Sequence, residues 1–257
     1  MSRIASAFAK LNRVALIPYI TVGYPSIEAT LEIVPLLAES GCDIVELGIP
    51  FSDPLADGAT IQHASYEALR QGVTPERCLE VAQALRQRVE IPLVFMTYYN
   101  PVLKFGLEEF CSKCAEVGID GLIIPDLPPE EGEELEQSSQ RHKLDLIYLL
   151  TPISTQERID IVASRSSGFV YLVSLTGVTG TRDKLPDELE SFVNRVRERT
   201  RKPLCVGFGV TTPEQARRIA KVADGVIVGS RIIQLMAEDT TFSSLKAFAS
   251  SLRDALG

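Results

Sequence analysis

Short apolar segments of strand length alternate with longer helical segments along the whole chain, and this alternation constrains the fold most strongly. Eight segments have the length and aliphatic composition of buried strands. They are Val14–Thr21, Asp43–Gly48, Pro92–Met96, Gly121–Pro125, Leu144–Leu150, Gly168–Ser174, Pro203–Phe208 and Gly225–Gly229. A repeat of one strand and one helix is typical of α/β proteins with a parallel sheet.

The strand segments are almost continuously apolar, as in LIYLL, FVYLV and GVIVG. We therefore expect both faces of the sheet to be covered, as in an all-parallel sheet. Eight units in 257 residues without a linker-like stretch predict a single (β/α)8 TIM barrel domain over residues 1–257. A doubly wound open sheet is the alternative, but its G-x-G-x-x-G fingerprint is absent after the first strand.

Helix signals add detail to this barrel. Apolar residues at helical spacing in Ile4–Leu11 predict an extra N-terminal helix, which could close the N-terminal end of the barrel. Helix starts are marked by Ser26, by Thr74 before Pro75, and by a capping box at 212–215. The connection between the second and third strands is the longest, and long loops at the C-terminal ends of barrel strands usually carry the chemistry.

Charge and composition exclude several functions. Lysine and arginine total 26 against 34 acidic residues, a net charge of −8 without long runs of one sign, which argues against nucleic-acid binding or a basic membrane face but allows a local basic pocket. No segment approaches the roughly 20 apolar residues of a membrane span, and the N-terminus does not resemble a secretory signal. We expect a cytoplasmic location, or the plastid stroma if a plant transit peptide has been removed.

The cysteines and histidines offer little chemistry. Five cysteines do not form a disulfide framework, and Cys111 and Cys114 lie on the apolar stripe of a predicted helix, so buried thiols are favoured over a redox or zinc site. His63 is predicted in a helix and His142 in a linker, away from the strand ends where a metal or a serine-histidine pair would be assembled. We therefore expect no metal.

Carboxylates cluster after the second strand. Glu46 lies near the C-terminal end of that strand among apolar neighbours, where desolvation would raise its pKa for general acid-base catalysis, although a structural ion pair is equally consistent. Asp53 and Asp57 follow in the loop Pro50–Gly58, where two carboxylates in different surroundings could take separate protonation roles. Asp-Pro and Asp-Gly turns could also explain at least one of the two acids.

Glycines mark the last three strand ends. Gly177–Gly180, Gly207–Gly209 and Gly229–Ser230 allow close backbone approach, and a helix start after the last strand attracts phosphate, so a phosphate site is favoured over plain turns. Aromatic residues also lie near strand ends and could line a pocket, although core packing explains most aromatics in strands. They are Tyr19, Tyr98, Tyr99, Tyr171 and Phe208.

These residues together resemble the tryptophan synthase α chain family over essentially the whole length. The resemblance rests on the run ELGIPFSDPLADG at 46–58 and on PDLP at 125–128, GVTG at 177–180, GFG at 207–209 and VGS at 228–230, in the family's order. It implies a lyase that splits indole-3-glycerol phosphate into indole and glyceraldehyde 3-phosphate without a cofactor on this chain. It also implies an α2β2 heterotetramer with a β chain that carries PLP and receives the indole.

The resemblance also assigns roles to single residues. Glu46 matches the general acid-base residue and Asp57 the carboxylate partner of the indole N–H. Gly180, Gly209, Gly229 and Ser230 match the phosphate contacts. Tyr19, Tyr171, Thr179 and Phe208 match substrate-lining or loop-closing positions. Asp53, next to Pro54, and Asp126 match the partner surface. Leu175 departs from the family, because many members carry an arginine there, so loop closure is expected to differ.

Three other functions compete with the α subunit. A free-standing indole-releasing lyase would use the same residues, and titration with a β chain would distinguish it. A regulatory protein that only docks on a β chain is disfavoured by intact Glu46 and Asp57. A generic phosphosugar isomerase on the same barrel would not explain the 46–58 run.

Overall fold

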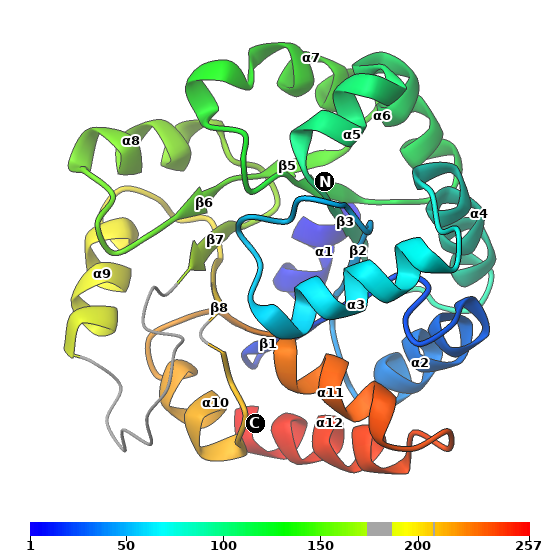
Figure 1. The fold of residues 1–257 in the computed structure, drawn as a ribbon. Helices are drawn as coiled ribbons and strands as arrows, with labels where there is room; N and C mark the ends of the chain where they lie inside the picture. Colours follow the sequence, from blue (N-terminus) through cyan, green and yellow to red (C-terminus); the bar gives the residue numbers. More distant parts are fainter. Residues whose placement is uncertain (174–186, 208) are drawn as a thin grey trace.

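The computed structural model describes residues 1–173, 187–207 and 209–257, and the strands in these ranges form one parallel sheet surrounded by helices (Figure 1). The strands are Ala15–Thr21 (β1), Val45–Gly48 (β2), Leu93–Met96 (β3), Gly121–Ile123 (β4), Asp145–Ile147 (β5), Leu149–Leu150 (β6), Val170–Val173 (β7), Leu204–Gly207 (β8) and Gly225–Val228 (β9). Each of the eight predicted strand segments contains one of these strands, except that Leu144–Leu150 contains two. The predicted ends Ser174 and Phe208 lie outside the described residues.

The helices follow the predicted alternation. They are Arg3–Lys10 (α1), Ile27–Glu39 (α2), Ala59–Arg70 (α3), Pro75–Arg86 (α4), Tyr99–Phe105 (α5), Leu107–Glu116 (α6), Glu133–Arg141 (α7), Gln156–Arg165 (α8), Asp187–Arg197 (α9), Pro213–Ile219 (α10), Ser230–Glu238 (α11) and Ser243–Leu256 (α12), with a 3-10 turn at Pro129–Glu131. The long connection after β2 is therefore a loop followed by two helices, α3 and α4. Within the described ranges, no helix has the length and apolarity that crossing a bilayer requires.

The sheet closes into a barrel where the chain passes from β5 to β6. The strand order runs β5-β4-β3-β2-β1-β9-β8-β7-β6, with every pairing parallel. Only Tyr148 separates β5 from β6, so the two are halves of one barrel strand, the first paired with β4 and the second with β7. The Tyr148 N–H donates to Ser166 Oγ at 3.1 Å, which interrupts the strand there. The predicted (β/α)8 barrel is confirmed. The sheet has nine strands instead of eight because the interruption at Tyr148 divides one barrel strand into β5 and β6.

Side chains on alternate strand positions divide the core into two layers. Most buried apolar residues lie between the strands and the surrounding helices. A second cluster fills the barrel interior and consists of Ile4, Ala15, Ile17, Ile44, Val94, Ile123, Ile147, Phe169, Cys205 and Ile227. This division explains why the strand segments lack polar alternation, since both faces are covered.

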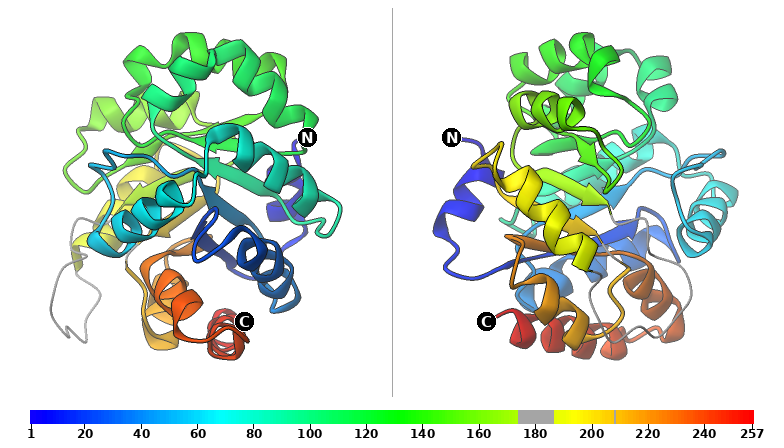
Figure 2. Two further views of the ribbon diagram at one scale, coloured as in Figure 1. Left: turned by 45° about the vertical axis from the view of Figure 1, so that its right-hand side comes forward. Right: turned by 90° about the vertical axis from the view of Figure 1, so that its left-hand side faces the viewer.

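Helix α1 covers one end of the barrel, as the sequence predicted. Ile4 is fully buried within the interior cluster, and the ring of Phe8 packs edge-on against Phe169 with 6.1 Å between the ring centroids. Figure 1 shows α1 inside the ring of strands, and Figure 2 shows it at the end of the barrel opposite α3. Because α1 covers the N-terminal end of the barrel, an active site can open only at the C-terminal end of the strands.

A repeated hydrogen bond stabilises the N-terminal edge of the barrel. In four places a residue that lies one to three positions before a strand accepts, through its side-chain oxygen, the N–H of a leucine in an adjacent earlier barrel strand. The pairs are Asp43 with Leu16 (2.9 Å), Asp120 with Leu93 (2.9 Å), Ser167 with Leu146 (2.7 Å) and Asp224 with Leu204 (2.7 Å). The bond thus recurs once in every two βα units. In each such pair of units it gives a hydrogen-bond acceptor to a leucine N–H of the first strand.

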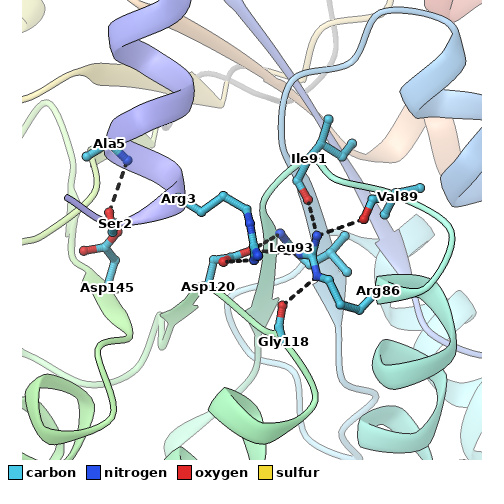
Figure 3. Close-up of polar contacts among 10 residues, drawn as sticks. All are labelled: Ser2, Arg3, Ala5, Arg86, Val89, Ile91, Leu93, Gly118, Asp120 and Asp145. Carbon is cyan, nitrogen blue, oxygen red and sulfur yellow. Dashed lines mark hydrogen bonds and ion pairs between the residues drawn. The ribbon is translucent and has the colours of Figure 1, made fainter.

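Arginines neutralise the aspartates of this edge. Asp120 lies between Arg3 of α1 and Arg86 of α4, and its carboxylate bonds to both (Figure 3). Arg86 also donates to the carbonyls of Gly118, Val89 and Ile91. Because Ser2 at the start of α1 donates to Asp145 at 2.5 Å, the N-terminal helix is attached to the barrel edge at two points (Figure 3).

The predicted helix starts and the predicted buried thiols are confirmed. Ser26 and Thr74 accept the N–H three residues on, and Thr212 with Gln215 forms the full capping box. Cys111 and Cys114 lie on α6 and are fully buried as free thiols, with the pKa of Cys111 raised by burial to about 11. A thiol in this state does not ionise near neutral pH, which leaves these cysteines a packing role.

Candidate active site

Glu46 lies inside the barrel as the second residue of β2, two residues before the C-terminal end of that strand. It stands beside Tyr19 of β1 and Val94 of β3 in the sheet register, and it alternates with Ile44, which faces the interior. The residue is fully buried. The strand therefore carries an acid into the middle of an apolar barrel.

The Glu46 carboxyl group has no polar partner within the described part of the chain. Neither of its two oxygens makes a hydrogen bond there, and no lysine or arginine pairs with it. Burial raises the pKa of Glu46 well above its ordinary value, which favours the neutral, protonated form of the group. The structural ion pair that the sequence left open is not formed among these residues, and a neutral acid able to donate a proton is what remains.

Asp57 is the second carboxyl group of the site. Asp57 ends a turn in which its N–H donates to the Pro54 carbonyl at 3.0 Å. The Gln62 side chain of α3 donates to the Asp57 backbone carbonyl at 2.9 Å. Burial raises the pKa of Asp57 to about 6, and the hydroxyl of Tyr98 limits the rise by donating a hydrogen bond to the carboxylate. Asp57 is therefore mostly ionised at neutral pH, whereas burial favours the neutral form of Glu46, so the two acids differ in the way that separate protonation roles require.

Two tyrosines bring these carboxyl groups into one cluster. Burial is the largest cause of the raised pKa of Tyr19 and of Tyr171, and Glu46 and Asp57, when ionised, both raise it further. Tyr19 is 7% exposed, and its hydroxyl lies 3.5 Å from Thr21 Oγ1. The sequence predicted both tyrosines at this end of the barrel, and the structure brings them together with the two acids.

Glycines on neighbouring strands leave the space for these two rings. A Cβ atom at Gly48 would lie 2.1 Å from the Tyr19 hydroxyl, and one at Gly207 would lie 2.7 Å from the Tyr171 hydroxyl. Such distances are far below van der Waals contact, so any larger residue would displace the ring. The glycine at each strand end therefore has a steric role in addition to any contact with a ligand.

The predicted phosphate residues are described in part. Gly229 caps α11 and Ser230 is its first residue, and no side chain caps that helix, so its first N–H groups are available to an anion within the described part of the chain. Gly209 is exposed with φ +62°, a conformation that favours glycine. Thr179, Gly180 and Phe208 lie outside the described residues.

Tyr98 has a more specific position than the sequence predicted. It follows β3, stacks on Phe51 with 5.2 Å between ring centroids, and accepts the N–H of Ala56 at 2.9 Å while donating to Asp57. The sequence identified it only as one aromatic residue at a strand end. Its hydroxyl was the available signal, since a phenol near an acidic loop can orient a carboxylate where phenylalanine cannot.

The residues predicted for a partner surface lie in exposed loops after β2 and β4. Asp53 is exposed and accepts a hydrogen bond from Ser52 at 2.5 Å, beside the half-buried Pro54. Leu55, the next residue, is 93% exposed. Asp126 is exposed and accepts the Tyr99 N–H at 2.8 Å. Their role in a partner interface stays a prediction.

The described residues contain no group of three or more histidine, cysteine or acidic side chains arranged to hold a metal ion. His63 lies on α3, exposed, and His142 follows α7, where it bonds to Glu108 at 2.8 Å. Both histidines are where the sequence predicted them. Proton transfer by Glu46 and Asp57 is the chemistry that the described site can perform without further groups.

A closed barrel with two carboxyl groups of raised pKa at the C-terminal end of its strands is typical of (β/α)8-barrel enzymes. The sequence profile of the family described as "Tryptophan synthase alpha chain" matches residues 5–254. The tryptophan synthase alpha chain of Dehalococcoides mccartyi is 59% identical over 256 residues, covering all of both chains, and that of Geobacter sulfurreducens is 48% identical, again over all of both. The chain therefore belongs to the tryptophan synthase alpha chain family, whose members are lyases.

Solved structures agree with this assignment. Tryptophan synthase subunit alpha from Legionella pneumophila superposes with a TM-score of 0.92 at 38% identity, over 99% of this chain and 98% of that one. A chain of Mycobacterium tuberculosis tryptophan synthase superposes with a TM-score of 0.93 at 40% identity, with the same coverage. The fold and the family thus agree over the whole length of the chain.

Proposed function

We propose that this chain cleaves indole-3-glycerol phosphate into indole and D-glyceraldehyde 3-phosphate. The observation that carries the proposal is the Glu46 carboxyl group, fully buried without a hydrogen-bond partner in the described part of the chain, where burial favours its protonated form. An acid in this state serves a reaction that begins by donating a proton to carbon. Family membership supplies the substrate.

The proposed reaction balances with these two carboxyl groups alone. Neutral Glu46 donates its proton to C3 of the indole ring, which leaves a positive charge shared with the ring nitrogen. The Glu46 carboxylate then removes the proton of the side-chain hydroxyl at the carbon attached to C3. The bond between these two carbons breaks, its electron pair returns to the ring, and the hydroxyl oxygen becomes the aldehyde. Glu46 ends protonated, as it began.

Asp57 stabilises the charged intermediate in this scheme. Its carboxylate, ionised at neutral pH because its pKa is about 6, accepts a hydrogen bond from the ring N–H as positive charge develops there. The Tyr98 hydroxyl holds that carboxylate in place. The two acids thus need different pKa values, which their different surroundings support.

The substrate phosphate is proposed to bind at the glycine-rich strand ends. The uncapped N-terminus of α11 at Gly229 and Ser230 and the exposed backbone of Gly209 support this position. Gly180 is proposed as a further phosphate contact, with Thr179 and Phe208 beside the substrate, from the family resemblance.

We propose further that the chain acts as the α subunit of an α2β2 tryptophan synthase. The relatives named tryptophan synthase support a β partner, and the exposed loop with Asp53, Pro54 and Leu55 offers a surface for it. Asp126 is a further candidate contact. No cofactor is proposed on this chain; PLP is assigned to the β chain, where the released indole would react.

Indole release from indole-3-glycerol phosphate tests both proposals. The purified chain is assayed alone and with a tryptophan synthase β chain titrated in. Slow release that rises with the β chain would support the lyase and the partnership together. Fast release at a rate that does not change when the β chain is added would support a free-standing lyase and overturn the partnership. No indole in either assay would overturn the proposed reaction.

A further inference from the structure

A pocket of about 660 Å³ opens at the end of the barrel that α1 covers, opposite the catalytic end. The segments that form it are the end of α1 with the following linker, the last turn of α9 with the segment before β8, and the connection from α10 to β9. Its volume lies within the roughly 300–1,000 Å³ of small-molecule sites. No residue of the proposed active site contributes to it.

The pocket is strongly cationic although the chain is acidic. Arg13, Arg197, Arg201 and Lys221 line it, and among the described residues that line it Asp224 is the single carboxylate. The whole chain carries a net charge of −8, so this concentration of positive charge is local. Basic residues at helix C-termini are common, but Arg201 and Lys221 lie beyond the ends of α9 and α10, in the connections to the strands.

The existing ion pairs do not neutralise the pocket. Asp224 is shared between Arg197 and the Leu204 N–H. Arg13 bonds to both carboxylate oxygens of Asp43, but Arg253 also bonds to that carboxylate at 3.0 Å, so two guanidinium groups share one negative charge.

Two cations of the pocket have no partner among the residues that the structure describes. The side chains of Arg201 and Lys221 make no hydrogen bond or ion pair with any residue that the structure describes, and Arg201 and Lys221 are both exposed. Positive charge brought together in this way is stabilised by an anion.

The remaining walls of the pocket are apolar. Phe8, Leu11, Val14, Pro203 and Val222 line it, each only partly buried. Phe8 is fixed by its edge-on contact with Phe169 inside the barrel. A simple inorganic ion would leave this apolar surface in contact with water, whereas a ligand with an apolar body would cover it.

We propose that this pocket binds a small aromatic phosphate ester. The phosphate would lie against Arg201 and Lys221, since guanidinium and ammonium groups suit phosphate oxygens, and the ring would lie on the apolar wall at Phe8 and Val222. The pocket is built from the segments that lead into β1, β8 and β9, so a bound ligand contacts the segments before all three strands. The ligand binds the folded chain only and therefore raises its melting temperature.

Calorimetric titration with phenyl phosphate tests the site. The full-length chain carries Ser230→Asp, which removes the proposed active-site phosphate contact, and we expect one remaining site. Adding Arg201→Glu and Lys221→Glu weakens binding by about tenfold or more, because each cation contributes a charged hydrogen bond. The neutral pair Arg201→Gln and Lys221→Gln weakens binding in the same direction and serves if the charge reversal perturbs folding.

The control has the same change in net charge at a distance from the pocket. Lys104→Glu with Lys246→Glu, on exposed positions of α5 and α12, leaves the affinity unchanged. Equal weakening in the control, or no weakening with Arg201 and Lys221 replaced, overturns the site. If inorganic phosphate binds as tightly as phenyl phosphate, the proposed contact between an aromatic ring and the apolar wall is overturned. In an otherwise wild-type chain, Arg201→Glu with Lys221→Glu leaves indole release unchanged, which separates this site from the proposed function.

Discussion

The Tyr98 hydroxyl donates a hydrogen bond to the Asp57 carboxylate and at the same time accepts the N–H of Ala56. This one contact joins the end of β3 to the acidic loop after β2. It also sets the protonation of Asp57, because burial alone would raise the pKa of that carboxyl group further than about 6.

Replacing Tyr98 with phenylalanine removes this donor. We expect the pKa of Asp57 to rise further, so that the acidic limb of the kcat/KM profile for indole release moves to higher pH by roughly one unit. Activity lost at neutral pH should return at higher pH, where Asp57 is again ionised. Tyr99→Phe is the matched control, since that residue contacts Asp126 through its backbone N–H. An unmoved acidic limb in Tyr98→Phe would remove Tyr98 from the control of Asp57.

Glu46→Gln should abolish indole release while leaving substrate binding largely intact. The amide has the same shape as the acid but cannot transfer a proton to or from carbon. Activity is measured by indole release and binding by calorimetry with the substrate. Cleavage at the wild-type rate would exclude Glu46 from the mechanism.

The same substitution has a pH-dependent effect on stability. The folded chain keeps the Glu46 proton at pH values where the unfolded chain, with an ordinary pKa of 4.5, has released it. The unfolded state then binds fewer protons, so the free energy of unfolding of the wild type falls as pH rises above 4.5, by up to about 1.4 kcal/mol per pH unit until the folded-state pKa is reached.

Glu46→Gln lacks this loss, so its stability relative to wild type should increase from about pH 5 to pH 7. Urea unfolding of both proteins across this range measures the difference. A difference that does not change with pH would mean that Glu46 titrates normally in the folded chain.

Ser230→Asp tests the phosphate site at the start of α11. A carboxylate there repels the substrate phosphate, and we expect KM to rise roughly tenfold or more with a smaller effect on kcat. Ser243→Asp makes the same change at the first residue of α12 and should leave KM unaltered. If Ser230→Asp also leaves KM unchanged, the phosphate binds elsewhere.

Asp120→Ala tests the N-terminal edge of the barrel. The substitution leaves the Leu93 N–H without its acceptor and Arg86, whose side chain is 12% exposed, without its carboxylate, so we expect a loss of about 3–5 kcal/mol in unfolding free energy. Adding Arg86→Met should recover part of this loss by removing the unpaired charge. Glu116→Ala, which breaks an exposed pair with Lys113, should leave the melting temperature nearly unchanged. Equal effects of Asp120→Ala and Glu116→Ala would show that the edge network contributes little.

Much of the barrel could be predicted from the sequence because its signals are local. A continuous apolar run is recognisable as a buried strand, and Ser26, Thr74 and Thr212 begin helices through hydrogen bonds that reach only three residues along the chain. The buried thiols of α6 follow from helical periodicity in the same way. The interruption at Tyr148 was not predictable, since it depends on a hydrogen bond from the Tyr148 N–H to Ser166, eighteen residues away.

The sequence by itself determined the strand and helix order, the family, and the placement of Glu46 on one strand and of Asp57 in the loop that follows it. Only the tertiary structure decided their chemistry. The sequence allowed an ion pair between Glu46 and an arginine. Barrel closure instead buries Glu46 without a hydrogen-bond partner among the described residues, which favours its neutral form. Asp57 acquired its partner Tyr98 from a separate strand end, about forty residues along the chain. A pKa depends on which groups closure brings together and how much water it excludes, and neither is encoded in local spacing.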